Sequence, residues 1–248
     1  MSRWVHLPGG SGGVWYADDP HQGPVVRRPV GAWSAAVHAL LTHLADAGAA
    51  GVPRVVGATE TEEVLTFLPG ATPVGDIPDT LLAEAAGWLR GFHDAVRDWD
   101  PGPRQWRQTD AAPEPGQIIC HNDPGVYNWV IRDGHFAGMI DWDQAGPGDP
   151  IHDVAFLCWS GVPLRDEFDP SDAARRVNLV AAAYGDLDPA ALLDAVGERI
   201  GLSLDRIQAG IDRGDPGMLA LERAGVLDTT RAALARFRAS LPGIRAAL

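Results

Sequence analysis

The 248-residue sequence contains no lysine, so arginine supplies all twenty of its basic residues. The absence resembles a GC-rich coding bias, and it means that any site that ordinarily uses lysine must use arginine here. Arginine can bind a phosphate through two N–H groups and stays charged without a partner. The net charge is 20 − 33 = −13. Many soluble proteins are acidic for solubility alone. Beyond that, such a chain is expected to repel nucleic acid and anionic membrane surfaces, and to favour cationic small molecules or metal ions.

Cysteine is scarce as well. Cys120 and Cys158 each lie in an apolar string, IIC and FLCW, which favours two buried free thiols over a disulfide or a metal-binding pair. The opening MSRWVHLPGG has no apolar stretch typical of a secretion signal, and no run approaches the ~18 apolar residues of a membrane span. We therefore expect a protein of a reducing, bacterial-type cytoplasm, with neither nucleic acid nor membrane as a partner.

The chain changes character near the Pro/Gly-rich stretch PGATPVGDIPD. Before it, the patterns read β-β-α-β-β, with the helix at 33–47. After it come a helical stripe at 80–97, a polar hairpin and a mostly helical remainder. We expect a nucleotide-binding lobe at 1–68, a hinge and linker at 69–78, and a catalytic and acceptor-binding lobe at 79–248. Helices in the last part are predicted at 171–184, 188–200, 203–212 and 216–240.

The polar hairpin begins in ICHNDPGVYNWVI, where charged and amide side chains interrupt a strand-like apolar context. Asp123 and Asn128 fit D-x-x-x-x-N, and Asp141 follows Asn128 by thirteen residues, across a turn at Asp133-Gly134. Because cross-strand neighbours lie about 5 Å apart, this hairpin can return Asp141 to Asn128. A carboxylate and an amide oxygen there form an oxygen-only site of the kind that Mg²⁺ accepts when phosphates complete its shell.

Asp123 stands at the start of the loop, where its carboxylate can accept or orient the proton of a hydroxyl nucleophile. A loop aspartate as base, with a loop asparagine and a later aspartate as metal ligands, is the pattern of phosphoryl transfer in kinases.

Taken together, H-x-D-x-x-x-x-N, I-D-W and G-D-P-x-x-D-x-A resemble the catalytic core of the aminoglycoside phosphotransferase family, the small-molecule kinase branch of the protein-kinase-like fold. The resemblance implies a two-lobed α+β fold, with a small β-rich N-lobe and a larger, mostly helical C-lobe. It also implies Mg²⁺ and ATP as cofactors, with GTP left open, and a small-molecule hydroxyl as the acceptor. An antibiotic such as an aminoglycoside is an acceptor whose positive charge suits the acidic chain.

By this resemblance, Asp123 is the catalytic base, while Asn128 and Asp141 hold the metal. Asp149 starts a helix as its N-cap, with Pro150 at the first helical position, and Asp153 braces the catalytic loop from behind. For His121 we favour a role in holding the loop over proton transfer. For Asp143 we favour a solvated turn carboxylate over a second metal contact.

In this family, a lysine on an early strand holds the nucleotide phosphates and pairs with a glutamate on the next helix. Here the strand reads VVRRP, so Arg27 or Arg28 must serve, and only one of them can face the cleft because successive strand residues point to opposite sides. We favour Arg27, because the proline after Arg28 is expected to end the strand. The helix at 33–47 contains no glutamate.

Two further segments are candidates for nucleotide contact. The loop GGSGG, with Gly10, Ser11 and Gly12 at its centre, is expected to cover the phosphates. The hinge LTFLPG offers backbone groups around Phe67 and Leu68 to an adenine, although Phe67 fits a core position equally well. Trp106, in the polar loop RQWRQ, is the tryptophan expected to face solvent or substrate.

Two functions fit these observations. The first is a phosphotransferase that moves the γ-phosphoryl group of a nucleoside triphosphate to a small-molecule hydroxyl, with a role in antibiotic resistance. The alternative is a catalytically weak kinase-like protein that binds a ligand or partner, such as an immunity or regulatory protein. The missing lysine–glutamate pair motivates the alternative, whereas the intact Asp123, Asn128 and Asp141 favour the enzyme.

Overall fold

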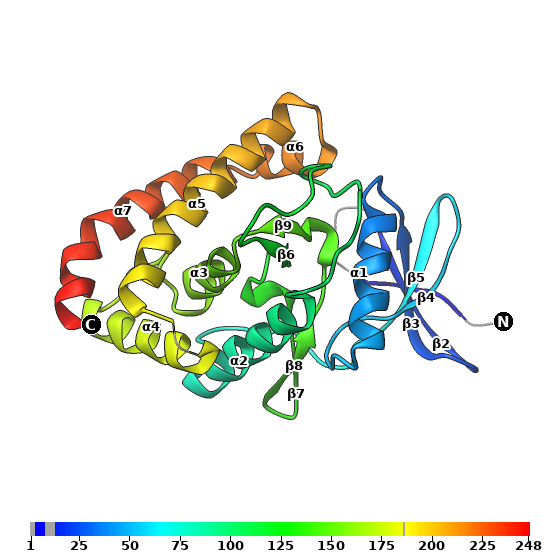
Figure 1. The fold of residues 1–248 in the computed structure, drawn as a ribbon, viewed down its shortest axis with the longest axis horizontal. Helices are drawn as coiled ribbons and strands as arrows, with labels where there is room; N and C mark the ends of the chain where they lie inside the picture. The colour runs from blue at the N-terminus through cyan, green and yellow to red at the C-terminus, as the bar shows by residue number, and fades with distance from the viewer. Residues whose placement is uncertain (1–2, 8–12, 186) are drawn as a thin grey trace. The chain divides into compact units, whose positions relative to one another are not determined.

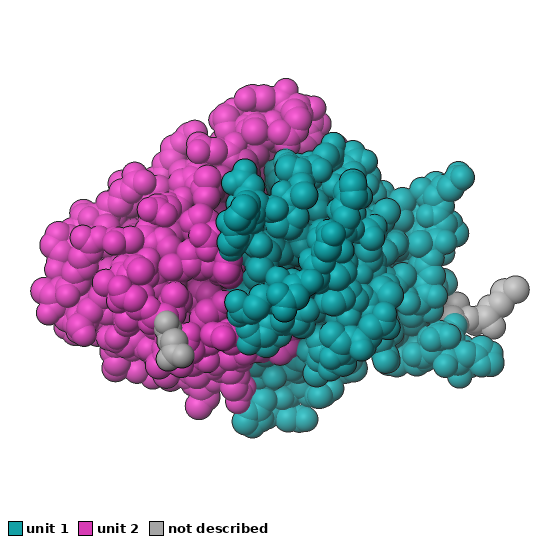
Figure 2. Space-filling model, viewed as in Figure 1, with its two compact units in different colours: residues 1–73, 91–123, 127–148 teal, residues 74–90, 124–126, 149–248 magenta. Residues whose placement is uncertain are grey.

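The computed structural model describes residues 3–7, 13–185 and 187–248. The chain forms two compact units, which Figure 2 shows in different colours. Unit 1 comprises Met1–Pro73, Gly91–Asp123 and Tyr127–Gly148, and unit 2 comprises Val74–Arg90, Pro124–Val126 and Asp149–Leu248. The lobe boundaries expected from sequence, at 68 and 79, stay a prediction.

Unit 1 is built around a five-stranded antiparallel sheet with the strand order β1-β2-β3-β5-β4 (Figure 1). Its strands are β1 (Val5–Leu7), β2 (Val14–Asp19), β3 (Gly23–Pro29), β4 (Val55–Ala58) and β5 (Glu62–Thr66). The helix α1 (Ser34–Asp46) connects β3 to β4 and buries an apolar face that includes Leu40, Leu41 and Leu44. The expected β-β-α-β-β pattern is therefore present, with one further strand, β1, before it.

Two small antiparallel pairs complete the strands of unit 1. β6 (Ile118–Cys120) pairs with β9 (Gly146–Gly148), and β7 (Trp129–Arg132) pairs with β8 (His135–Met139). The β7–β8 turn consists of Asp133 and Gly134, both at positive φ, as a two-residue hairpin requires. The predicted hairpin and its turn are thus confirmed. Short 3-10 turns, η1 (Val126–Asn128) and η2 (Trp142–Gln144), precede β7 and follow β8.

Unit 2 is helical in the part of the chain described. Beyond the first part of α2 (Asp79–Val96), it contains α3 (Pro150–Gly161), α4 (Pro170–Tyr184), α5 (Pro189–Asp212), α6 (Pro216–Arg223) and α7 (Val226–Ala247). The helices α3 to α6 begin in the same way, with an aspartate N-cap followed by proline at the first helical position. The aspartate accepts a free backbone N–H, and proline has none to leave unsatisfied. The N-cap predicted at Asp149 is confirmed, since its carboxylate accepts from the Ile151 N–H at 3.1 Å.

Two predicted helix boundaries are wrong. The segments 188–200 and 203–212 form the single helix α5, in which the Ser203 hydroxyl donates back to the Arg199 carbonyl at 3.2 Å and stays within the helix. The predicted helix at 216–240 is instead two helices, because Gly225 adopts a left-handed conformation between α6 and α7. Within the described residues, no helix is both long enough and apolar enough to span a bilayer.

Candidate phosphoryl-transfer site

The loop between β6 and β7 contains the residues that the sequence singled out. His121 is fully buried directly after β6, and its ring packs against Trp142 at a centroid distance of 4.6 Å. Its Nδ1 accepts from the backbone N–H of Asp123 at 3.3 Å, so Nε2 carries the proton and donates to the Ile140 carbonyl at 3.2 Å. Both ring nitrogens therefore face backbone groups, which agrees with the predicted role of His121 in holding the loop; that role stays a prediction.

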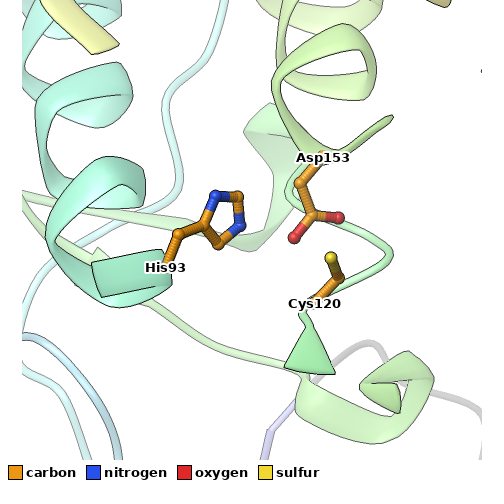
Figure 3. A group of neighbouring side chains, drawn as sticks. All are labelled: His93, Cys120 and Asp153. Atoms are coloured by element: carbon orange, nitrogen blue, oxygen red, sulfur yellow. The ribbon is translucent and has the colours of Figure 1, made fainter. Parts of the chain in front are cut away.

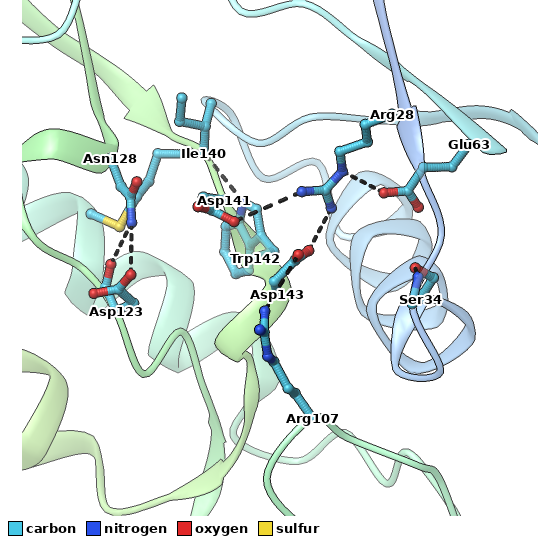
Figure 4. Close-up of polar contacts among 12 residues, drawn as sticks. Arg28, Ser34, Glu63, Arg107, Asp123, Asn128, Ile140, Asp141, Trp142 and Asp143 are labelled. Atoms are coloured by element: carbon cyan, nitrogen blue, oxygen red, sulfur yellow. Dashed lines mark hydrogen bonds and ion pairs between the residues drawn. The ribbon is translucent and has the colours of Figure 1, made fainter. Parts of the chain in front are cut away.

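Asp123 is held by two side chains from the same loop. The Asn128 Nδ2 donates to the Asp123 carbonyl at 2.9 Å and to its carboxylate at 3.2 Å (Figure 4). Because both partners are acceptors, the amide nitrogen must face them, and the Asn128 oxygen faces away from these two contacts. Tyr127, whose side chain is half-exposed, donates its hydroxyl hydrogen to the other carboxylate oxygen of Asp123.

Asp141 follows the return strand, as the hairpin length predicted. The backbone N–H of Ile140 donates to the Asn128 carbonyl at 2.9 Å, which extends the β7–β8 pairing to the residue before Asp141. Asp141 itself is left-handed, with φ 62°, a conformation that aspartate tolerates better than most residues. Its side chain is 54% exposed. The pKa of Asp141 is raised, first by desolvation and then by the neighbouring Asp143 carboxylate, against the opposing effect of Arg28 and Arg107.

Arg28, on β3, is the arginine that reaches this carboxylate edge. Its Nη1 lies 3.8 Å from an Asp141 oxygen and its Nη2 donates to Asp143 at 2.6 Å, while its Nε donates to Glu63 at 2.5 Å (Figure 4). Burial lowers the pKa of Arg28, but the carboxylates of Asp143, Glu63 and Asp141 more than offset that effect, so the pKa is raised overall. The guanidinium is fully charged at any physiological pH.

Arg27 points elsewhere. Its Nε lies 3.6 Å from Glu62, and its guanidinium lies over the Trp4 ring at 4.7 Å. Arg28, and not the favoured Arg27, therefore reaches the Asp141 edge, and phosphate binding by either arginine stays a prediction. Pro29 does not end the strand at Arg28, because β3 extends to Pro29, which has Glu62 as its cross-strand partner.

The expectation that Asp143 is a solvated turn carboxylate is wrong. Its side chain is 20% exposed, and in addition to Arg28 it faces Arg107, whose Nη1 is 3.8 Å away. The Arg107 guanidinium lies over the Trp33 ring at 4.2 Å. Asp143 thus lies between two cations that come from β3 and from the loop before β6.

Trp106, in that same loop, is 3% exposed, so the expectation that it faces solvent or substrate is wrong. A Cβ atom added to Gly146 would lie only 3.2 Å from the Trp106 Cβ, closer than an ordinary van der Waals contact. The polar neighbours in RQWRQ concealed a core residue that packs closely against Gly146.

The remaining predicted nucleotide contacts are less well supported. Gly10, Ser11 and Gly12 lie outside the described residues. The N–H groups of Thr66 and Phe67 already donate to the carbonyls of Arg54 and Pro24, both at 2.9 Å. Neither N–H is therefore available to an adenine, and the Phe67 ring packs edge-on against Tyr16.

Leu68, next along the chain, is half-buried, and its adenine contact stays a prediction. Asp153 is fully buried on α3 in unit 2, and its bracing role likewise stays a prediction.

Sequence reasoning missed Glu63 and His38. Glu63 lies directly opposite Arg28 in the β3–β5 register and is 1% exposed, and its second oxygen is paired with His38 Nε2 from α1. The signal was the doublet EE on one strand and RR on another, which antiparallel pairing can align charge against charge.

Cys120 and Cys158 are both buried, and they form no disulfide, as predicted. Cys158 belongs to unit 2, and burial raises the pKa of its thiol. Cys120 belongs to unit 1 and is drawn in Figure 3 with His93 and Asp153, each of which is also buried.

Comparison with known proteins identifies the family. The model of the phosphotransferase enzyme family matches residues 102–193, which include every residue of the Asp123 loop and the return strand. The trifolitoxin immunity protein of Rhizobium leguminosarum bv. trifolii is 34% identical over 184 residues, which are 71% of this chain and 69% of that protein. The chain belongs to the phosphotransferase enzyme family.

Solved members of this kinase-like group share the fold. The amicoumacin kinase hAmiN, in complex with AMP-PNP, Ca²⁺ and Ami, superposes with a TM-score of 0.67 at 14% identity, covering 96% of this chain and 87% of that one. The microcompartment-associated aminopropanol kinase gives 0.66 at 13% identity, covering 98% and 93%. The predicted α+β, protein-kinase-like fold is confirmed, and the phosphotransferase family places this chain among proteins of small-molecule kinase type.

The residues of this phosphotransferase-family site fit a divalent cation. Asn128 and Asp141 present only hard oxygen donors, which are the ligands that Mg²⁺ takes. Desolvation is the first cause of the raised pKa of Asp141, and the neighbouring Asp143 carboxylate adds negative charge that a cation would offset.

Proposed function

We propose that this protein transfers the γ-phosphoryl group of a nucleoside triphosphate to a hydroxyl of a small molecule. In this reaction, Asp123 accepts the hydroxyl proton, while Asn128 and Asp141 hold Mg²⁺ and Arg28 binds the nucleotide phosphates. The bound Mg²⁺ supplies neutralising charge to the phosphates during transfer. The cofactors are Mg²⁺ and ATP, with GTP as the second candidate nucleotide.

The observation that carries this proposal is the way Asp123 is held. Asn128 binds both the backbone carbonyl and the carboxylate of Asp123, and Ile140 ties the Asn128 backbone to the strand that ends at Asp141. One asparagine thereby fixes the base with its amide nitrogen and keeps its oxygen for the ion. This arrangement of three polar residues supports phosphoryl-transfer chemistry over ligand binding alone.

The acceptor that we propose is a cationic antibiotic-like molecule. The net charge of −13 favours a positively charged ligand over an anionic one. The names of two similar proteins, an immunity protein and an amicoumacin kinase, agree with a role in self-protection or resistance. We expect the protein to act in the cytoplasm.

A second candidate function is a kinase-like binder that protects by holding its ligand without modifying it. One observation favours it: Arg28 is already paired with Asp143 and lies 3.8 Å from Asp141, the residue proposed to hold the metal. Similarity to an immunity protein is compatible with this function too.

Nucleotide binding separates the two functions. Isothermal calorimetry with ATP, and separately with GTP, is carried out with and without Mg²⁺. The phosphotransferase requires Mg²⁺-dependent binding of at least one of them. Absence of such binding would leave the binder as the function.

Once a nucleotide binds, γ-labelled nucleotide is used to screen acceptors, with aminoglycosides first. Label transferred to a hydroxyl supports the proposal. Tight acceptor binding without transfer, at saturating nucleotide, contradicts it.

A further inference from the structure

Arg28, the residue proposed to bind the nucleotide phosphates, has its acidic partner, Glu63, on a strand. Arg28 and Glu63 are directly opposite each other on β3 and β5, and the Arg28 Nε donates to a Glu63 oxygen at 2.5 Å. The other Glu63 oxygen is paired with His38 of α1. The helix α1 contains no glutamate of its own, so His38 is the contact that it makes with this ion pair.

The position of Glu63 determines how Arg28 presents its charge. Glu63 binds the Nε side of the guanidinium, which turns Nη1 and Nη2 toward Asp141 and Asp143 (Figure 4). Because the guanidinium is planar and rigid, fixing its Nε edge also fixes the direction of its two terminal N–H₂ groups. Those groups are the ones that bind a phosphate in a two-point contact.

The burial of Glu63 shields its ion pair with Arg28 from solvent. The glutamate is 1% exposed and the Arg28 side chain 18% exposed, so the pair is shielded from the screening that weakens surface ion pairs. A buried carboxylate that accepts from one cation on a strand and from a histidine on a helix is constrained from two directions. The neighbouring pair, Arg27 and Glu62, is more exposed and longer, with 31% and 47% side-chain exposure and 3.6 Å between the atoms.

We propose that Glu63 is the positioning residue for nucleotide binding, orienting Arg28 toward the triphosphate from β5 instead of from the helix. This inference rests on the proposed function, and it assigns to a strand residue the task that the family resemblance gives to a helix glutamate. Glu63 contacts neither phosphate nor acceptor; it acts through Arg28.

The test compares Glu63→Gln with Glu62→Gln, its matched control one residue away on the other side of the strand. Affinity for Mg²⁺·ATP and for adenosine is measured by calorimetry for the unmodified protein and both variants. Losing the charge that orients Arg28 is expected to weaken ATP binding by about 10-fold, the scale of a hydrogen bond to a charged group. Adenosine has no phosphates, so the affinity of Glu63→Gln for adenosine is expected to stay unchanged. Glu62→Gln is expected to change the affinity for neither ATP nor adenosine.

Glu63→Asp is the second variant, since it keeps the charge but is one methylene too short to hold both partners. It is expected to bind ATP with an affinity between those of Glu63→Gln and the unmodified protein. Equal loss of ATP and adenosine affinity in both Glu63 variants would mean a merely structural role and would overturn the inference. Unchanged ATP affinity would overturn it as well. Failure of the unmodified protein to bind any nucleotide would instead overturn the proposed function, and this inference with it.

Discussion

Asp123 is held by donors on both carboxylate oxygens and is tied to its neighbours through its own backbone. Asn128 and Tyr127 supply the two side-chain donors, and His121 accepts the Asp123 N–H. Such constraints fix the direction in which the carboxylate can accept a further proton. At the scale of single residues, the site is therefore organised before any ligand binds.

Asp123→Asn tests the base directly. The amide has the same shape but cannot take a proton, so transfer is expected to fall by about 10²–10⁴-fold. Nucleotide affinity is expected to stay close to that of the unmodified protein, because Asp123 is not proposed to hold phosphate. Labelled-phosphate transfer and calorimetry measure the two quantities.

The control for that experiment is Asp133→Asn, an exposed aspartate at the β7–β8 turn whose left-handed conformation asparagine also tolerates. It is expected to leave both transfer and nucleotide affinity unchanged. Retained transfer in Asp123→Asn would exclude Asp123 as the base.

Arg28→Ala and Arg27→Ala form a second pair of variants. Only Arg28 faces the Asp141 edge, whereas Arg27 pairs with Glu62. Removing the Arg28 guanidinium is expected to weaken Mg²⁺·ATP binding by about 10- to 100-fold, the scale of a charge-assisted hydrogen bond, and removing Arg27 to have little effect. Calorimetry measures both affinities. Equal and small effects would mean that neither arginine holds phosphate.

At the scale of helices and strands, contacts within one hairpin can be predicted from sequence spacing, whereas contacts between distant strands cannot. The pairing of Asn128 with Ile140, the residue before Asp141, is local: an Asp-Gly turn and a fixed hairpin length determine the register, so spacing predicts that Asp141 follows close behind. The Arg28–Glu63 relation joins two strands that have α1 and β4 between them in the chain. Its register depends on packing of the whole sheet, which spacing does not encode.

Helix boundaries show the same division between local and non-local information. Four Asp-Pro pairs mark the starts of helices because capping is a property of adjacent residues. The continuity of α5 through Gly201 and Ser203 was not visible, since both residue types often end helices. The burial of Trp106 could not be predicted from the sequence either, because Trp106 packs against Gly146, which is distant in sequence.

An ion-pair cluster between two helices of unit 2 predicts a pH-dependent contribution to stability. Asp79, the first residue of α2, lies 3.2 Å from Arg176 Nε and is also bound by Arg175, both on α4. The hydrogen bond from Arg175 is the main reason that the pKa of Asp79 is lowered, with Arg176 adding to the effect against desolvation. A carboxyl group whose folded pKa is depressed stabilises the fold above its unfolded pKa of about 3.9. The contribution is lost as pH falls through the lower, folded value.

Asp79→Asn is therefore expected to lower the free energy of unfolding at pH 7 by up to about 1 kcal/mol, since the group is partly exposed. The difference from the unmodified protein is expected to shrink below pH ~3.9. Urea unfolding at pH 7, 5 and 3 measures it. Asp172→Asn, which removes only a surface partner of Arg175, is the control with a smaller expected effect. A difference that grows on acidification would contradict the assignment.

At the scale of the whole molecule, each compact unit contains one buried thiol, Cys120 in unit 1 and Cys158 in unit 2. Neither thiol is exposed, and burial raises the pKa of Cys158, which disfavours the reactive thiolate. Modification of either cysteine therefore requires opening of the structure around it. Cys120 belongs to the unit that holds the candidate site, and Cys158 belongs to the helical unit.

Ligand binding is expected to protect these thiols unequally. Labelling with a thiol reagent is followed in Cys158→Ala, where Cys120 reports, and in Cys120→Ala, where Cys158 reports. A nucleotide at 100 times its dissociation constant stabilises the state that binds it by about 2.7 kcal/mol, which slows labelling through that opening by about 100-fold.

Because Arg28, Asn128 and Asp141 all belong to unit 1, Mg²⁺·ATP is expected to slow labelling of Cys120 by about this factor. Cys158 is expected to be slowed only to the extent that unit 2 opens together with unit 1. Equal protection would mean that the two units open as one cooperative structure. Protection of Cys158 alone would contradict a nucleotide site built from unit 1, because a ligand stabilises the region whose opening destroys its own binding site.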